Sequence, residues 1–463
     1  MLGAVLKHLA DDRPAALNRL KEFLAIPSIS TDSAYAADVR GGADWIVAAL
    51  RQAGFDATAH ETNGHPVVVG SAGPKGDQPG ALYYGHYDVQ PPDPVESWIS
   101  PPFEPTVRDG AVFARGACDD KGQICCILEA LRAWKQVHDD VPLPITVLFE
   151  GEEECGSRNL PAFVEGNRSL LDVGGDGRGV AVISDTNMWE SPDGPLVAIT
   201  YGLRGMVYYD VELHGPTRDL HSGMYGGTLA NPATILTKVL GGLFDDDRRV
   251  TIPGFYDDVA PPDEEEQLRW NQLQFDEKNF LGAVGVGEGF GEKGFDLLAR
   301  RWARPSCDIN GLYGGYGGEG AKTIIPGFAG AKVSFRLVPN QTPETIAQSF
   351  ETWVRSHEVP GCTWKLTSHG QATPVVVPTD SPHLAAAVRA VETSAAHRPV
   401  LIREGGTIPV VHDFKKTLGL DTLLIGFGRM DDCVHAPNEK FNLHSFELGC
   451  RTHAALISEL AKM

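Results

Sequence analysis

Helical and strand-like spacings of apolar residues alternate along the chain up to about residue 185. Apolar residues at i, i+3, i+4 and i+7 predict amphipathic helices over 14–26, 41–54 and 120–137. Short apolar runs around these helices predict strands over 65–72, 81–89, 111–116, 144–151 and 181–185. Strands that alternate with helices indicate an α/β domain with a largely parallel sheet.

The pattern changes after about residue 205, where strict alternation predicts a half-buried antiparallel strand over 205–215. Helical and strand-like segments then alternate at 231–244, 329–339, 343–357 and 363–370. This order is typical of a small α+β domain of the split βαβ kind. The α/β pattern returns with a helix after residue 380 and a strand over 422–428.

We therefore expect an inserted domain. Residues 1–205 and 379–463 form the first domain, and residues 206–378 form the insertion. Residues 245–300 are acidic and rich in glycine, and the pattern assigns them no clear structure.

Composition limits the partners of the chain. Its 463 residues are 42% hydrophobic and carry a formal net charge of −21. The length is typical of about two to three domains, and the negative charge disfavours nucleic acid and anionic membranes as partners. No apolar run reaches the length of about 18 residues that a membrane span needs, and the N-terminus lacks the basic region of a signal peptide. The eight cysteines have no CxxC spacing, so we expect reduced thiols and a cytoplasmic protein.

Six short segments carry acidic residues or histidines that together fit a two-metal hydrolase site. They are YYGHYDVQPP (83–92), RGACDDKGQ (115–123), FEGEEECGS (149–157), VISD (182–185), DLHSG (219–223) and CVHAPNE (433–439). Each of them alone is a weak signal, and the combination carries the prediction.

The first two segments offer a histidine and a bridging carboxylate. His86 and Asp88 lie two residues apart at a strand end, on one face of the strand, so Asp88 can orient a ligating imidazole. A surface H-x-D on a loop is the alternative interpretation. Asp119 and Asp120 precede the helix at 120–137, where N-capping is the ordinary explanation for one acid. Two acids favour a metal-bridging role for Asp119.

The third segment follows the buried strand at 144–151 directly. Ligands in α/β proteins lie at the carboxyl ends of parallel strands, and consecutive glutamates there repel one another unless a cation relieves them. Glu154 is suited to metal ligation and Glu153 to general base catalysis. A solvated acidic loop is the alternative.

The remaining segments supply single candidates. Asp185 ends a strand as His86 does, and His435 lies in a turn after the strand at 422–428. His221 lies in the inserted domain, so it can reach the site only by domain closure or from another subunit.

Two other patterns are rejected. The stretch 314–323 resembles a P-loop, but Ala321 separates Gly320 from Lys322, and no helix is predicted after it. Ser222 lies beside His221 without a nucleophile elbow around it.

In combination the motifs resemble those of the M20 metallopeptidase family, and the likeness extends over essentially the whole chain. It rests on GHYDVQP, RGACDDKGQ, EGEEECGS, ITYGLRG, DLHSGMYGG, FRLVPN, REGGTIP and HAPNEKF in the family's order. The dipeptidase branch, with the cytosolic non-specific dipeptidases and carnosinases, is the most similar. The resemblance implies a mostly parallel α/β di-metal peptidase domain with an inserted α+β lid or dimerisation domain.

The resemblance also implies roles for single residues. Asp119 bridges two divalent ions, Zn²⁺ by preference or else Mn²⁺ or Co²⁺. One ion is completed by His86 and Asp185 and the other by Glu154 and His435. Glu153 is the general base that deprotonates a metal-activated water, and Asp88 orients His86. The implied substrate contacts are His221 from the partner subunit of a homodimer, Thr323, Arg336, Glu404 and Thr407.

Three functions stay open at this point. The first is hydrolysis of dipeptides with a free amino terminus, which Asp rather than Glu at position 185 favours within the family. The second is an N-acyl amino-acid deacylase or carboxypeptidase on the same scaffold, and the third is a non-catalytic binding protein. Three thiols, Cys118, Cys155 and Cys433, flank the expected ligands, either as small packing residues or as redox-sensitive groups.

Overall fold

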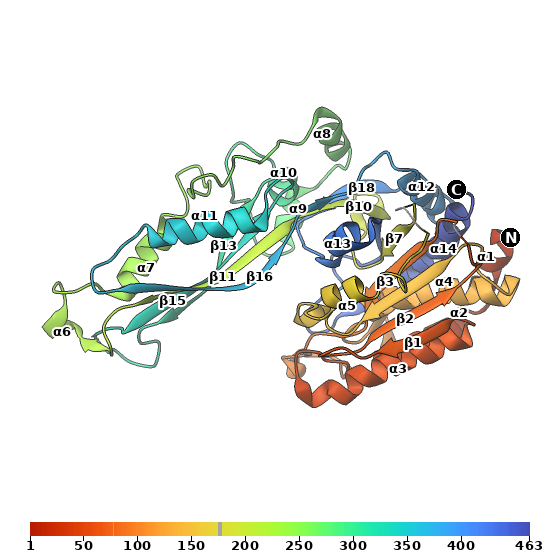
Figure 1. The fold of residues 1–463 in the computed structure, drawn as a ribbon, viewed down its shortest axis with the longest axis horizontal. Helices are drawn as coiled ribbons and strands as arrows, with labels where there is room; N and C mark the ends of the chain where they lie inside the picture. Colours follow the sequence, from red (N-terminus) through yellow and green to blue (C-terminus); the bar gives the residue numbers. More distant parts are fainter. Residues whose placement is uncertain (77, 175–177) are drawn as a thin grey trace. The chain divides into compact units, whose positions relative to one another are not determined.

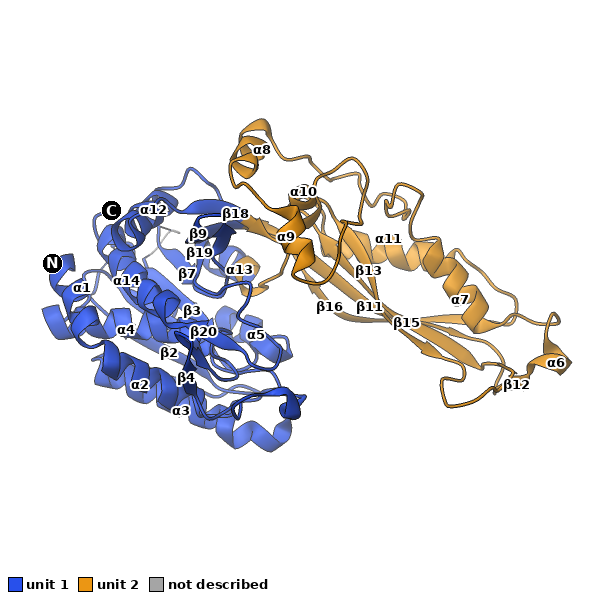
Figure 2. Ribbon diagram, turned by 180° about the vertical axis from the view of Figure 1, so that it is seen from behind, with its two compact units in different colours: residues 1–201, 377–402, 413–463 blue, residues 202–376, 403–412 orange. Residues whose placement is uncertain are grey.

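The structure is a computed structural model that describes residues 1–76, 78–174 and 178–463. It divides into two compact units (Figure 2). Unit 1 consists of Met1–Tyr201, Val377–Ile402 and Asp413–Met463, and unit 2 of Gly202–Val376 and Arg403–His412. Within the described residues, none of the helices is long and apolar enough to cross a membrane.

Unit 1 is built on a mixed sheet with parallel strands at its centre (Figure 1). In spatial order its strands are β1 (Asp56–His60), β2 (Val67–Ala72), β6 (Ile145–Glu150), β3 (Ala81–His86), β7 (Val180–Ile183), β19 (Asp421–Gly426) and β10 (Ala198–Leu203). The pairs β6–β3, β3–β7 and β7–β19 are parallel, and the outer pairs β1–β2, β2–β6 and β19–β10 are antiparallel. The predicted α/β class is thus confirmed.

The other elements of unit 1 surround this sheet. Its helices are α1 (Leu2–Asp11), α2 (Arg13–Leu24), α3 (Ala36–Gln52), α4 (Lys121–His138), α5 (Leu160–Gly166), α12 (Pro382–Ala395) and α14 (Leu443–Leu460). Short strands form two small sheets, β4 (Thr106–Arg108) with β5 (Ala111–Phe113) and β20 (Lys440–Asn442), and β8 (Trp189–Ser191) with β9 (Gly194–Leu196).

A few short elements lie where the chain passes from one unit to the other. The segments β17 (Val375–Val376) and β18 (Val400–Glu404) pair with β10, and α13 (Val410–Asp413) precedes a π-helical turn at Phe414–Leu418.

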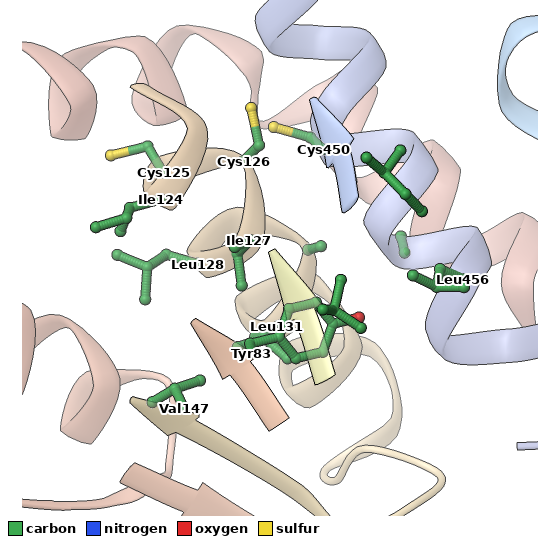
Figure 3. Packing of buried hydrophobic residues seen from close by; sticks show 14 of the residues in the cluster. Tyr83, Ile124, Cys125, Cys126, Ile127, Leu128, Leu131, Val147, Cys450 and Leu456 are labelled. Carbon is green, nitrogen blue, oxygen red and sulfur yellow. The ribbon is translucent and has the colours of Figure 1, made fainter. Parts of the chain in front are cut away.

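Helix α4 is the central helix of the unit 1 core. Its predicted apolar stripe is present, but residues 121–134 are buried on every side, because α1, α2 and α14 pack against α4 in addition to the sheet. Figure 3 shows Leu131 beside Tyr83 of β3, and Cys126 of α4 near Cys450 of α14. Burial of each aliphatic side chain here contributes roughly 1.5–3 kcal/mol. This packing fixes the start of α4, and with it the loop that carries Asp119.

Unit 2 is a four-stranded antiparallel sheet with helices packed against it. The strand order is β13 (Ser306–Gly314), β15 (Phe328–Leu337), β11 (Gly205–His214) and β16 (Thr363–Ala372). Inward positions of β11 alternate with half-buried ones, as predicted. The helices are α6 (Ser222–Tyr225), α7 (Pro232–Gly241), α8 (Glu264–Asn271), α9 (Glu277–Gly282), α10 (Leu297–Trp302) and α11 (Pro343–Arg355), and β12 (Leu220–His221) pairs with β14 (Ile324–Ile325).

Two differences from the expected pattern stand out in unit 2. Strand β13 was not predicted and adds a fourth strand at the edge of the sheet. The unassigned segment 245–300 holds the short helices α8 and α9 and the start of α10. Each of these three helices begins with an aspartate whose carboxylate accepts a backbone N–H, namely Asp263, Asp276 and Asp296.

The buried His453 of α14 makes the stability of unit 1 sensitive to acid. Its ring lies against Tyr83 and Phe427, with centroids 5.8 and 5.6 Å apart, and neither ring nitrogen has a hydrogen-bond partner among the described residues. Burial lowers the pKa of His453 from 6.5 to about 3. The unfolded chain therefore binds a proton that the folded chain excludes, so this contribution to stability is complete above pH 6.5 and is lost as the pH falls toward 3.

The replacement His453→Leu removes this titration. We expect the free energy of unfolding of the variant to fall less between about pH 7 and about pH 5 than that of the parent, as measured by urea unfolding. Comparing each protein with itself at the two pH values cancels the packing effect of the substitution. An identical loss in both proteins would show that His453 is not the acid-sensitive group.

Candidate metal centre

Three of the candidate ligands lie at neighbouring carboxyl ends of parallel strands. His86 is the last residue of β3, Asp185 lies two residues beyond the end of β7, and Glu154 lies in a 3₁₀ turn (Glu153–Cys155) that follows β6. The sheet order β6–β3–β7 brings these strand ends to one edge. The strand pattern alone already predicted this edge as the site.

Five side chains form two groups of three potential metal ligands. One group contains His86, Asp119 and Asp185, and the other contains Asp119, Glu154 and His435. In each group the ligand atoms lie within 4.8 Å of one another. The structure thus brings together all five residues that were predicted from the sequence to bind metal.

Asp119 belongs to both groups and turns one carboxylate oxygen toward each. Its Oδ1 lies 3.0 Å from His86 Nε2, and its Oδ2 lies 2.9 Å from His435 Nε2. Capping of α4, the ordinary alternative, is not its role, because Asp120 is the N-cap residue and makes no side-chain capping bond. A carboxylate presented in this way can bridge two cations.

The donor set fits a pair of divalent cations. His86 Nε2 lies 3.9 Å from Asp185 Oδ2, and His435 Nε2 lies 3.2 Å from Glu154 Oε2. Each group thus combines one imidazole with two carboxylates, a mixture that suits Zn²⁺ and also Mn²⁺ or Co²⁺. Burial raises the pKa of Asp185 well above its usual value, with the Asp119 carboxylate adding to the rise. This crowding of negative charge is the condition that a bound cation relieves.

Asp88 contacts residues of both ligand groups without being a ligand candidate itself. His86 Nδ1 lies 3.2 Å from the Asp88 carbonyl oxygen and 3.5 Å from its Oδ1. The buried carboxylate also accepts the backbone N–H groups of Glu153 and Glu154, at 3.2 and 3.0 Å. Asp88 is therefore placed to set both the orientation of the His86 ring and the start of the 3₁₀ turn.

Glu153 lies next to these ligands but belongs to neither group of three. Burial raises the pKa of Glu153 from 4.5 to about 7; the charge of His86 opposes the rise, and the carboxylates of Glu154 and Asp88 add to it. A carboxyl group with a pKa near neutrality can both take up and release a proton in a reaction at pH 7.

Sequence reasoning missed two residues that hold the ligands in place. Gln90 Nε2 donates to Glu154 Oε2 at 2.8 Å. The buried Glu439 accepts the backbone N–H groups of Gly116, Cys118 and Asp119 at 2.8, 2.9 and 3.1 Å, and it pairs with Arg115 at 2.8 Å. Glu439 therefore fixes the loop that carries the shared carboxylate. Both residues lie inside the quoted motifs, which were the only available signal.

The thiols beside the ligands differ in exposure. Cys118 is buried, Cys155 is half-buried and Cys433 is exposed. Burial raises the pKa of Cys118 well above its usual value and that of Cys155 to about 11, so both are held as thiols. The first two fit the packing interpretation better than the redox one.

The five proposed substrate contacts all belong to unit 2 and fall into two separate places. Arg336 Nη1 donates to Thr407 Oγ1 at 2.9 Å, and Glu404 lies 3.8 Å from Arg301. His221 lies elsewhere, on β12, where its neighbour Ser222 donates to the Thr323 carbonyl at 3.2 Å. His221 is exposed, and its Nδ1 accepts the Gly223 N–H at 3.0 Å.

The register of unit 2 separates these two places by almost the length of a strand. Arg336 pairs with Met206 at the start of β11, whereas His214, at the other end, precedes the turn to β12. Eight residues of antiparallel strand span about 27 Å. Figures 1 and 2 place α6, which follows His221 directly, at the end of unit 2 remote from the start of β11.

Comparison with known proteins agrees with the geometry of the site. The model of peptidase family M20/M25/M40 matches residues 82–459. The chain is 32% identical to the Cys-Gly metallodipeptidase DUG1 of Candida albicans over 95% of its own length and 93% of that protein. It is 33% identical to the human Beta-Ala-His dipeptidase over 86% of its length and 78% of that protein. An M20 family metallo-carboxypeptidase from Sulfolobus solfataricus has a similar structure, with a TM-score of 0.86 and 30% identity over 97% of this chain and 99% of that chain.

Proposed function

The chain belongs to peptidase family M20/M25/M40, and from this premise we propose that it is a metallopeptidase that hydrolyses dipeptides with a free amino terminus. The observation that carries the proposal is the shared Asp119, which faces two groups of three ligands. The dipeptidase names of its relatives point to the substrate class.

Two divalent cations would be the cofactor; His86, Asp119 and Asp185 would hold one, and Asp119, Glu154 and His435 the other. When bound, they would supply Lewis acid chemistry and lower the pKa of water. We propose Zn²⁺ as the natural ion, because imidazole and carboxylate donors suit it. We also propose a cytoplasmic location, which the eight free cysteines support.

Within this site we assign the proton transfers to Glu153. It takes a proton from the attacking water and returns it to the leaving amine, a role open to a carboxylate that lies beside the ligands but belongs to neither group of three. Asp88 holds His86 in position, and His221 donates a hydrogen bond to the oxyanion that develops on the peptide carbonyl.

Arg336 is the proposed partner of the substrate's free carboxylate. No carboxylate of the described residues forms a salt bridge with it, and its guanidinium is oriented by Thr407. A guanidinium binds a carboxylate through two parallel hydrogen bonds. Thr407, Glu404 and Thr323 are the further proposed contacts.

The distance between His221 and Arg336 supports a homodimer. A dipeptide spans only about 7 Å, whereas the two residues of one chain are separated by almost the length of β11. One substrate can therefore touch both only if they come from different subunits. We propose that His221 completes the site of the partner subunit.

Mixing two inactive variants tests this sharing. Glu153→Ala and His221→Ala are each expected to have little activity, but a mixed dimer contains one site with both residues intact. Random pairing makes half of the dimers mixed, so we expect about one quarter of the parent activity after the subunits are dissociated and reassociated. A mixture no more active than its components would place His221 in its own subunit's site or outside catalysis.

A substrate panel tests the function itself. Metal-stripped protein is assayed with unblocked dipeptides and N-acyl amino acids, before and after addition of Zn²⁺ or Mn²⁺. We expect metal-dependent cleavage of the unblocked dipeptides only. Cleavage of acylated substrates or of longer peptides would favour the deacylase or carboxypeptidase alternative. The structural likeness to a metallo-carboxypeptidase is the observation that supports testing this alternative. Metal binding without any hydrolysis would favour a binding protein.

A further inference from the structure

Unit 2 contains a cavity of unusual charge, and none of its lining residues is assigned above to metal. Its volume is about 710 Å³, and it is lined mostly by the segment 244–308, together with Arg204. Five guanidinium groups and three carboxylates line it, an excess of two positive charges in a chain whose net charge is −21. The arginines are Arg204, Arg248, Arg300, Arg301 and Arg304.

Two of these arginines have carboxylate partners. Arg304 binds Glu292 through two hydrogen bonds of 2.8 and 2.7 Å. Arg301 lies 3.8 Å from Glu404. Their charges are largely balanced, so the excess positive charge resides on the other three, above all on Arg248 and Arg300, because Asp308 acts on Arg204.

The other three arginines are oriented by neutral groups. Arg248 donates to the Gly291 carbonyl at 3.3 Å, Arg300 to the Glu292 carbonyl at 2.9 Å, and Arg204 to the Gly405 carbonyl at 3.1 Å. Throughout the described ranges, none of the three forms a salt bridge with a carboxylate. A backbone carbonyl fixes the direction of a guanidinium without neutralising it, so each retains free N–H donors.

The carboxylates of the lining do not neutralise Arg248 or Arg300, whereas the charge of Asp308 offsets that of Arg204 in part. Glu292 is occupied by Arg304. Asp245 Oδ1 accepts the backbone N–H groups of Asp247 and Arg249 in its own turn, both at 2.9 Å. Burial lowers the pKa of Arg204 to about 10, and the charge of Arg336 adds to this. An anion would relieve that repulsion.

Aromatic and aliphatic side chains form the rest of the wall. Phe290 lies under the Arg248 guanidinium at 3.6 Å, and Phe280 lies under that of Arg301 at 4.6 Å. Leu281 and Leu297 also line the cavity. Such stacking holds the guanidinium planes and supplies apolar surface for the body of a ligand.

We propose that this cavity binds a small organic carboxylate with an aromatic or aliphatic body, through residues other than the metal ligands. Arg248 and Arg300 bind the carboxylate, and Phe280 and Phe290 contact the body. Arg204 connects the cavity to the proposed substrate contacts, because its backbone carbonyl accepts the Thr407 hydroxyl at 2.6 Å. A ligand here is thus placed to alter substrate binding. The proposal goes beyond the peptidase function and does not depend on it.

Calorimetric titration of the full-length, metal-stripped protein tests the site with phenylacetate and its neutral isostere phenylacetamide. We expect saturable binding of phenylacetate and at least about tenfold weaker binding of the amide, since a charge-assisted bond is lost. Arg248→Gln and Arg300→Gln should each weaken phenylacetate binding by about tenfold or more. Arg355→Gln, an exposed arginine outside the cavity, should leave it unchanged.

Several outcomes would overturn the proposal. They are absence of saturable phenylacetate binding, equal affinity for the amide, or unchanged affinity in both cavity variants. Loss of binding in Arg336→Gln with full binding in the cavity variants would place the anion at the substrate contacts instead. The comparison of acid with amide needs no variant, so it holds even if a substitution impairs folding. Because metal is absent, a failed peptidase assay does not affect the result.

Discussion

Replacing Glu153 by alanine is expected to lower kcat by about 10²- to 10⁴-fold, the usual contribution of a general base, and to leave the metal content unchanged. The two effects separate because Glu153 belongs to neither group of ligands, while its backbone N–H, which the substitution retains, is the group that binds Asp88. The carboxylate is thus lost without disturbing the turn that carries Glu154.

Two further variants make this result decisive. Glu153→Gln keeps the shape of the side chain but cannot accept the proton, so it should be as impaired as the alanine variant. Glu165→Ala removes an exposed glutamate of α5 that pairs with Arg168, and it should behave as the parent. Steady-state kinetics and metal analysis are measured on the same samples. A kcat near the parent value in Glu153→Ala would exclude Glu153 as the base.

Replacing Asp119 by asparagine is expected to abolish measurable activity and to remove both cations. One carboxylate oxygen faces His86 and the other faces His435, so a single substitution weakens both groups of three. The neighbouring carboxylates of Asp185 and Glu154 remain, but each belongs to one group only. We expect metal affinity to fall by more than about 100-fold, beyond the loss of a residue that only orients a ligand.

Asp185→Asn is the matched control, since it changes the same chemical group in one site alone. Metal analysis after dialysis should then find about one ion per chain in Asp185→Asn and almost none in Asp119→Asn. Circular dichroism checks that both variants are folded. Retention of two ions at parental affinity in Asp119→Asn would contradict the bridging role.

The helices and strands that could be predicted from the sequence were those whose apolar residues recur at regular spacing. The stripe at 120–137 predicted α4, and the alternation at 205–215 predicted β11, because the apolar residues of each recur with the period of the element. Strand β13 was missed, since most of its residues are exposed or half-buried and it contains two glycines, as an edge strand allows. No pattern indicated α14, where the buried polar residues Thr452, His453 and Glu459 interrupt the apolar sequence.

The ligand residues were predictable because of their chemistry and their place at strand ends. The residues that hold them were not, because their partners are distant in sequence: Glu439 meets Cys118 across 321 positions, and Gln90 meets Glu154 across 64. Such bonds arise only when strands and loops assemble. The arginine cavity was not predictable for the same reason: its lining residues come together only in the folded chain, and no sequence motif marks them.

The α/β class, the expectation of an inserted unit and the set of metal donors follow from the order of the amino acids, because hydrophobic periodicity and residue chemistry are local properties. The three-dimensional arrangement was needed to see that Asp119 presents one carboxylate oxygen to each of two imidazoles. It was also needed to see that Arg336 and His221 lie near opposite ends of the unit 2 sheet. Distances between segments depend on strand order and register, and no local pattern encodes these, since they follow from how the whole chain buries its apolar faces.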